Sequence, residues 1–236
     1  MTKTILTNEQ LAALKKYDTP TICNALDILL QGQRVNFNTT SLYCAYPDMP
    51  PMVGYAKTAT IRSTEPTLNA PEKHMDDRFN YWTYLSNGPV PAVSVIQDLD
   101  GSEAGYGAFW GEVNSNTHKA FGCIGTVTDG SVRDLDMIAK DFQLIAGRVS
   151  PYGGTVYLVN WDCRVNIRGM LVKSGDLMHA DRHGAVVIPD DVADKVVDAA
   201  ELCIRREAVM LKESTSGGAV TPTSLMNAYI AAGKVE

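Results

Sequence analysis

The chain has 236 residues, 45% of them hydrophobic and 20% charged, which is typical of a globular protein with one sizeable core. Its net charge of −6, without any lysine- or arginine-rich run, argues against a nucleic-acid partner, because phosphate binding needs a basic surface. No stretch approaches the roughly 20 apolar residues of a membrane span, and the first residues lack the charged start and apolar run of a secretory signal. We therefore expect a cytoplasmic protein with no membrane partner.

Two short helices are expected near the start of the chain. Thr7 and Gln10 have the spacing of a capping box ahead of an apolar run. A second helix begins near Asp18, with Pro20 in its first turn, and ends at Gly32. The polar, aromatic and proline-rich residues 33–51 are expected to form a loop.

The middle of the chain alternates apolar runs with helical patterns. Helices are expected over residues 76–85, from Gly107 to Lys119, and over 134–141. Strands are expected over residues 52–62, 92–97, 123–128, 144–147, 156–158, 165–167, 170–172 and 185–188.

A long amphipathic helix is predicted over residues 190–212, followed by a flexible linker over 214–219. Thr221 and Pro222 then start a last short helix that ends at Gly233. We predict a single α/β domain of layered type over residues 1–213, with residues 214–236 as linker and C-terminal helix.

Two glycine-containing segments follow predicted strands. Asp98-Leu99-Asp100-Gly101 lies where open α/β sheets place their sites, but a simple Asp/Gly turn explains it better. In the segment from Gly105 to Val113, glycines precede a helix start, which is a place that holds carboxylates or phosphates. Its spacing matches neither the dinucleotide-binding fingerprint nor a P-loop.

The third segment is Asp129-Gly130-Ser131-Val132-Arg133-Asp134, between a strand and a helix. The Arg133 guanidinium suits a carboxylate, and the Asp134 oxygens suit Mg²⁺. Chemistry alone favours a simpler interpretation, an Arg–Asp surface pair with Asp134 as a helix cap.

The five cysteines are odd in number and scattered, so neither a disulfide framework nor a cysteine zinc site is expected. The histidines lack zinc-site spacing, and no Gly-x-Ser-x-Gly elbow indicates a serine hydrolase.

Together these segments resemble the RraA-like family, from about Thr19 to Pro189. The match rests on the Thr19–Leu26 helix, on Ala108 to Val113, on the Asp-Gly-x-x-Arg-Asp motif at 129–134, and on Gly175-Asp176 through Gly184 to Pro189. This family contains 4-hydroxy-4-methyl-2-oxoglutarate and 4-carboxy-4-hydroxy-2-oxoadipate aldolases, and proteins named as regulators of ribonuclease E activity. The resemblance implies a layered αβ fold like that of swivelling phosphohistidine domains, assembled as homotrimers or homohexamers.

For the site, the resemblance implies that Arg133 contacts a small 2-oxo acid and that Asp134 positions a divalent metal, Mg²⁺ or Mn²⁺. Backbone amides of Trp110, Gly111, Glu112 and Val113 would hold the substrate, and the bulky Trp110 side chain is expected to shape the pocket.

The expected reaction is retro-aldol cleavage, or decarboxylation of a β-keto diacid, through a metal-stabilised enolate. The substrate's hydroxyl proton is taken either by a metal-bound water or by the Asp129 carboxylate, and the sequence does not choose between these two bases. Glu207 on the long helix is a candidate for delivery into an adjacent subunit's site. Two alternatives remain: a non-catalytic regulator that binds a ribonuclease or helicase, and an inactive structural trimer.

Overall fold

The computed structural model describes residues 5–65 and 71–236. Its largest element is a mixed eight-stranded sheet with the order β1-β7-β5-β3-β2-β12-β13, to which β9 is added by pairing with β2. The strands are β1 (Tyr43–Cys44), β2 (Met52–Arg62), β3 (Ala92–Asp98), β5 (Cys123–Thr128), β7 (Gln143–Ala146), β9 (Tyr157–Trp161), β12 (Leu177–Asp181) and β13 (Gly184–Ile188). The central strands β2, β3, β5 and β7 are parallel, and the others pair antiparallel.

Smaller elements complete the domain. A short parallel sheet contains β4 (Ala108–Trp110), β6 (Ser131–Val132) and β8 (Arg148–Val149), and a hairpin contains β10 (Val165–Ile167) and β11 (Met170–Val172). The helices are α1 (Asn8–Leu14), α2 (Thr19–Leu30), α3 (Pro71–Ser86), α4 (Glu112–Ala120), α5 (Val196–Ser214) and α6 (Pro222–Ala232). Single 3₁₀ turns lie at Gly101–Glu103, Leu135–Met137 and Ala193–Lys195.

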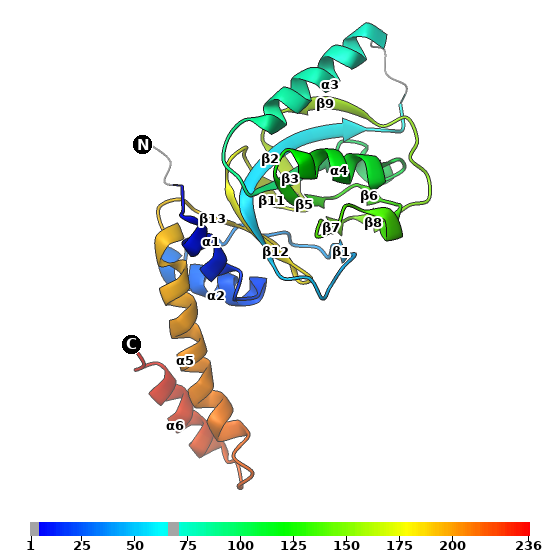
Figure 1. Cartoon of the computed structure of the whole chain (residues 1–236). Coiled ribbons are helices and arrows are strands. Elements are labelled where there is room, and N and C mark those ends of the chain that lie inside the picture. Colours follow the sequence, from blue (N-terminus) through cyan, green and yellow to red (C-terminus); the bar gives the residue numbers. More distant parts are fainter. Residues whose placement is uncertain (1–4, 66–70) are drawn as a thin grey trace.

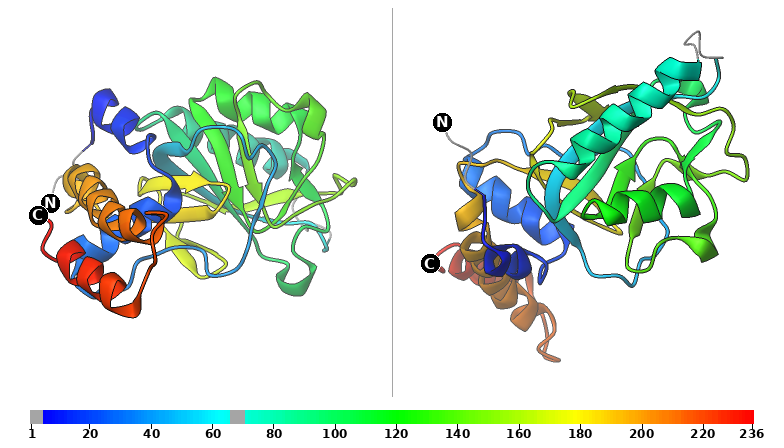
Figure 2. Two further views of the ribbon diagram at one scale, coloured as in Figure 1. Left: turned by 90° about the horizontal axis from the view of Figure 1, so that it is seen from below. Right: turned by 45° about the horizontal axis from the view of Figure 1, so that its top comes forward.

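The helices form two groups around the sheet (Figure 1). Helices α3 and α4 lie on one side, where Tyr81 and Leu85 of α3 pack in a core cluster with Ile61 and Ile96 of the sheet. Helices α1, α2 and α5 pack together at the β12–β13 end, and α6 lies against α5 (Figure 2). The α/β layered fold expected from the sequence, with helices at both ends of the chain, is confirmed.

Local sequence explains the best-predicted elements. The Thr7 side chain accepts a hydrogen bond from the Gln10 amide, and the Gln10 side chain accepts one from the Thr7 amide, so the capping box is present. The Asp18 carboxylate caps α2 by accepting from the Thr21 amide. Strand β2 is buried along its whole length up to Ile61, because both of its faces are covered, as is usual for strands of a parallel sheet.

Other expectations were wrong in detail. The helix expected over residues 134–141 is only a 3₁₀ turn, because Asp134 adopts a left-handed conformation with φ 52° that a helix cannot continue. The helix expected directly after Gly107 begins at Glu112, preceded by strand β4. Strand β12 was not predicted, and α5 begins at Val196 rather than at residue 190.

All five cysteines are free thiols. Among the helices that the structure describes, none combines the length and apolar character needed to cross a membrane.

Candidate active site

Strand pairing brings the two predicted site segments together. Strand β6 pairs in parallel with β4, so that Val132 lies opposite Trp110, and the Arg133 amide donates to the Trp110 carbonyl at 2.9 Å. The chain leaves both strands at the same end, since the strands are parallel. As a result, Gly111 at the start of α4 lies directly beside Arg133 and Asp134.

Gly111 is needed for this close approach. A Cβ at Gly111 would lie 2.5 Å from Asp134 Oδ2 and 3.3 Å from Arg133 Cγ. The N-cap residue Gly111 has no side chain to cap α4, and the Glu112 amide instead donates to Asp134 Oδ2 at 3.4 Å. The carboxylate therefore lies at the positive end of the α4 dipole, where negative charge is favoured.

The Arg133 side chain lies close to two glycines. A Cβ at Gly153 would lie 3.2 Å from Arg133 Cζ, and a Cβ at Gly111 would lie 3.4 Å from Arg133 Nε. Arg133 Nε lies 3.7 Å from Asp134 Oδ2, and the two side chains are 43% and 30% exposed. Within the described part of the chain, no acceptor is hydrogen-bonded to the Arg133 Nη groups, so this guanidinium is available to an incoming anion.

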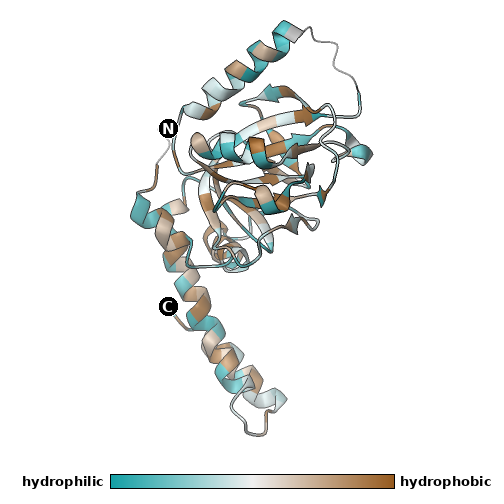
Figure 3. Cartoon of the chain, turned by 45° about the vertical axis from the view of Figure 1, so that its right-hand side comes forward, coloured by the Kyte–Doolittle hydropathy of each residue, from teal (hydrophilic) through white to brown (hydrophobic). Residues whose placement is uncertain are grey.

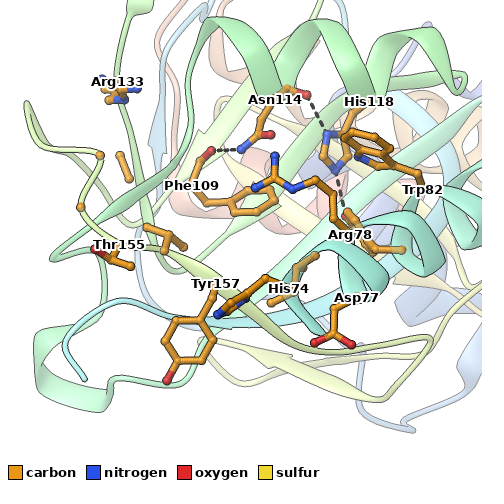
Figure 4. A pocket seen from close by; sticks show the side chains of 16 residues that line it. His74, Asp77, Arg78, Trp82, Phe109, Asn114, His118, Arg133, Thr155 and Tyr157 are labelled. Atoms are coloured by element: carbon orange, nitrogen blue, oxygen red, sulfur yellow. Dashed lines mark hydrogen bonds between the residues drawn. The ribbon is translucent and has the colours of Figure 1, made fainter. Parts of the chain in front are cut away.

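Arg133 also borders a cavity of about 360 Å³ that opens between α3, β4, α4 and the 153–158 segment (Figure 4). A cavity of this volume is at the lower end of the range for small-molecule sites. It is lined by His74, Asp77, Arg78, Tyr81, Trp82, Ala108, Phe109, Asn114, His118, Arg133, Gly153, Gly154, Thr155, Val156, Tyr157 and Leu158.

One wall of the cavity is a fixed, neutral histidine. His118 is buried; its Nε2 lies 2.8 Å from the Tyr81 hydroxyl, and its Nδ1 lies 2.7 Å from the Asn114 carbonyl. Burial lowers the pKa of His118 to about 4, so the ring is uncharged at neutral pH. The Asn114 amide in turn donates to the Phe109 carbonyl at 2.5 Å, which ties α4 to β4.

The expectation that the Trp110 side chain shapes the pocket was wrong. Trp110 has 0% exposure, and its ring packs 4.5 Å from His118 and 5.5 Å from Phe142, measured between ring centroids. Alternation along β4 places Phe109 toward the cavity and Trp110 into the core. Only the backbone of Trp110 remains available to the site. Glu112 and Val113 form the exposed first turn of α4, with Val113 74% exposed.

The Asp129 and Asp98 carboxylates lie where β5 and β3 end, and both accept hydrogen bonds from backbone amides. Asp129 Oδ1 accepts from the Asp98 amide at 2.7 Å, and Asp98 Oδ2 accepts from the Gly105 amide at 2.7 Å. Burial raises the pKa of Asp129 to about 6. Asp129 is not among the residues that line the cavity, and the Asp98–Gly101 segment is a hydrogen-bonded turn, as the simpler interpretation held.

Glu207 lies far from these residues within one chain. It is on α5, where Glu207 Oε1 accepts from the Asn24 side chain at 3.3 Å, while β6 and β8 lie on the other side of the domain (Figure 1). The structure thus gathers Gly111, Glu112, Arg133 and Asp134, but not Glu207.

The donor set suits a hard cation with a largely aqueous shell. Among the described residues, no group of three or more His, Cys, Asp or Glu side chains could enclose a metal ion. Asp134 contributes a single, partly exposed carboxylate. Mg²⁺ binds through one or two carboxylates with retained waters, whereas Zn²⁺ prefers nitrogen and sulfur donors. The residues present therefore fit Mg²⁺ or Mn²⁺ and do not fit Zn²⁺.

Sequence reasoning missed the cavity wall. Arg78, Phe109 and Asn114 come from α3, β4 and α4, and no motif spacing links the α3 residues to Arg133. The adjacent Gly153 and Gly154 were the one available signal, because paired glycines mark places where a backbone approaches another group closely.

Comparison with known proteins identifies related chains. The chain is 28% identical over 142 residues to Protein DlpA from Legionella pneumophila subsp. pneumophila (strain Philadelphia 1), a match that covers 59% of this chain and 22% of DlpA. It spans less than half the length of the curated relatives that it matches.

Solved structures share the fold. An uncharacterized protein from Pseudomonas syringae pv. tomato str. DC3000 has a TM-score of 0.70 at 24% identity, covering 98% of this chain and 97% of that one. RraAS2 from Streptomyces coelicolor, described as an unusual member of the RNase ES inhibitor RraA protein family, has a TM-score of 0.65 at 20% identity, covering 91% and 99%. The sequence model of the RraA-like family, described as Aldolase/RraA, matches residues 19–187, which include the whole Arg133–Asp134 site. The chain belongs to the RraA-like family.

Proposed function

We propose that the protein is a divalent-metal-dependent carbon–carbon lyase that acts on small 2-oxo acids by retro-aldol cleavage or decarboxylation. The observation that carries this proposal is the juxtaposition of Arg133 and Asp134 at the start of α4, with Gly111 leaving room for the carboxylate. An ion pair of purely structural value would not need guanidinium Nη groups left open beside a ligand-sized cavity.

Arg133 binds the substrate carboxylate. Its Nη groups can form two parallel hydrogen bonds to a carboxylate, a geometry that a lysine cannot reproduce. The Val113 amide lies in the first turn of α4 and offers a donor for an adjacent oxygen, while the Glu112 amide already donates to Asp134 Oδ2. Asp134 would hold Mg²⁺ or Mn²⁺, which when bound supplies Lewis-acid stabilisation of negative charge on the 2-oxo oxygen.

Bond cleavage leaves its electron pair on the fragment that becomes pyruvate. The Arg133 guanidinium and the α4 amides offset that charge as it develops. In the aldol reaction the hydroxyl proton must leave the substrate, and C3 of the pyruvate fragment must gain one. Water at the half-exposed face of Arg133 and Asp134 can accept and return this proton. The Asp129 carboxylate is a weaker candidate, because it is hydrogen-bonded beneath the site rather than lining the cavity.

A homo-oligomer, a trimer or a dimer of trimers, is part of the proposal. Helices α5 and α6 extend away from the domain, and apolar residues lie along them (Figure 3). The exposed ones include Ile204, Leu211, Met226, Tyr229 and Ile230. An exposed apolar surface on an extended hairpin suits burial against another copy. Glu207 on α5 would then come close to a neighbouring subunit's Arg133 rather than to its own.

A panel of 2-oxo and 4-hydroxy-2-oxo acids, with pyruvate detection and Mg²⁺ present, tests the proposal. We expect multiple turnovers on at least one substrate of the panel at the pH of the cytoplasm. We also expect the Asp134→Asn protein to lose this turnover. A folded protein that turns over no member of the panel would favour the alternative, a non-catalytic regulator of a ribonuclease.

A further inference from the structure

The cavity beside Arg133 contains a second arginine that the proposed reaction does not use. Arg78 lies on α3, on the same helix face as His74 and Tyr81, since residues three and four apart lie together on a helix. Figure 4 shows its side chain extending from α3 toward the cavity. Its guanidinium carbon lies 5.9 Å from the centre of the Trp82 ring.

Arg78 has no anionic partner among the residues that the structure describes. The neighbouring carboxylate, Asp77, is held by Lys73, whose Nζ lies 2.9 Å from Asp77 Oδ1. His118 is neutral. The cavity lining therefore has two guanidinium groups, and its one carboxylate, Asp77, is already paired with Lys73. Arg133 has Asp134 beside its Nε, outside the lining, whereas Arg78 has no such carboxylate among the described residues. Such an excess of positive charge favours an anionic ligand over a neutral one.

Helix α3 is fastened firmly enough to position Arg78. On one side of the helix, the Tyr81 hydroxyl lies 2.8 Å from His118 of α4. One turn further along, the Tyr84 hydroxyl accepts from the Thr58 amide at 2.9 Å and lies 2.7 Å from Ser174 Oγ. These contacts join α3 to both α4 and the sheet, so Arg78 is carried by a fixed element rather than by a free loop.

The cavity lining also has apolar side chains. Phe109, Val156 and Leu158 belong to it, together with the rings of Trp82 and Tyr157. The cavity of about 360 Å³ is larger than a three-carbon acid needs. A ligand that satisfies this lining has an anionic group at each end and a carbon body between them.

We propose that Arg78 is a specificity-determining residue that binds a second carboxylate at the remote end of the substrate. The assignment rests on the proposed lyase function for the orientation of the substrate, with its 2-oxo acid end at Arg133. Substrates that lack the remote carboxylate leave Arg78 without a partner and bind more weakly.

Equilibrium binding tests the assignment without requiring turnover. Isothermal titration calorimetry on the full chain compares glutarate, adipate and pimelate with the monoacids of the same chain length. In the wild type, at least one diacid should bind roughly tenfold more tightly than its monoacid, as expected for one charge-assisted hydrogen-bonded pair. Arg78→Met should abolish that preference. Lys119→Met removes one charge from α4 outside the cavity lining and should keep it.

A matched substrate pair extends the test to the reaction. Retro-aldol cleavage of 4-hydroxy-2-oxoadipate breaks the C3–C4 bond to give pyruvate and malonate semialdehyde, and the same cleavage of 4-hydroxy-2-oxohexanoate gives pyruvate and propanal. Arg78→Met should raise KM for the first substrate by roughly tenfold and leave KM for the second unchanged.

Two results overturn the assignment: no diacid preference in the wild type, or a preference that survives in Arg78→Met. Failure of the lyase proposal gives a different pattern. In that case no pyruvate appears from either substrate, while the Arg78-dependent preference for diacids persists in the calorimeter.

Discussion

Gly111→Ala should damage the site while leaving the fold intact. The new Cβ would lie 2.5 Å from Asp134 Oδ2, whereas an ordinary contact begins near 3.4 Å, so the carboxylate must move by about 0.9 Å. Gly111 has φ −164°, an extended conformation that alanine adopts readily, so no backbone strain is added. The Asp134 side chain is 30% exposed and can rotate away at a cost of about 1 kcal/mol.

The expected loss of activity is much larger than the loss of stability. A displacement of about 1 Å at a catalytic group costs on the order of 100-fold in rate, or about 2.7 kcal/mol of transition-state stabilisation. Pyruvate release measured across a Mg²⁺ titration should show a lower kcat/KM and a higher Mg²⁺ requirement. The melting temperature should fall by only a few degrees.

Gly218→Ala is the matched control, because its Cβ would meet only Ser216 Oγ, at 3.7 Å. This variant should behave as wild type. If Gly111→Ala kept the wild-type kcat/KM and the wild-type Mg²⁺ requirement, the position of the Asp134 carboxylate would be irrelevant to the reaction, and the reasoning would be refuted.

Three further predictions follow from the same geometry. Arg133→Lys should lose about 2–4 kcal/mol of transition-state stabilisation despite its retained charge, measured as kcat/KM, because lysine lacks the bidentate fork; equal kcat/KM values would exclude Arg133 as a substrate ligand. Trp110→Ala should destabilise the fold by about 3–5 kcal/mol and lower the melting temperature by about 10 °C, because the ring is wholly buried. The relative rates of Trp110→Ala across a substrate panel should equal those of the wild type. A changed order of substrate preference would mean that the Trp110 ring does shape the pocket. Light scattering should give a homo-oligomer, a trimer or hexamer, and an active monomer would contradict the role given to α5 and α6.

The sequence displayed the two segments that the structure brings together at the proposed site. The Asp-Gly-x-x-Arg-Asp motif lies within six consecutive residues, and the strand before it was recognisable from its apolar run. The glycine-rich segment ending at Val113 was recognisable because its glycines also lie within a few consecutive residues. Local patterns of this kind depend on neighbouring residues, which a sequence displays directly.

What depends on tertiary packing was not predictable from local pattern. Either Phe109 or Trp110 could have faced the ligand, and the choice depends on the pairing of β4 with β6. The helix expected from Asp134 onward does not form, because Asp134 itself adopts a left-handed backbone conformation beside Gly111. Arg78 reaches the cavity only because α3 packs against α4 and the sheet, through contacts between residues up to 90 positions apart.

The most direct test of the lyase proposal is pyruvate formation from oxaloacetate by metal-stripped protein, before and after Mg²⁺ is restored. The Asp134→Asn protein at the same concentration measures the background reaction of free Mg²⁺ with the substrate. We predict no enzymatic turnover after exhaustive chelation, full recovery on adding Mg²⁺ to the wild type, and none above background in Asp134→Asn. Undiminished turnover in the chelated protein, or equal rates in the two proteins with Mg²⁺, would contradict a metal-dependent reaction at Arg133 and Asp134.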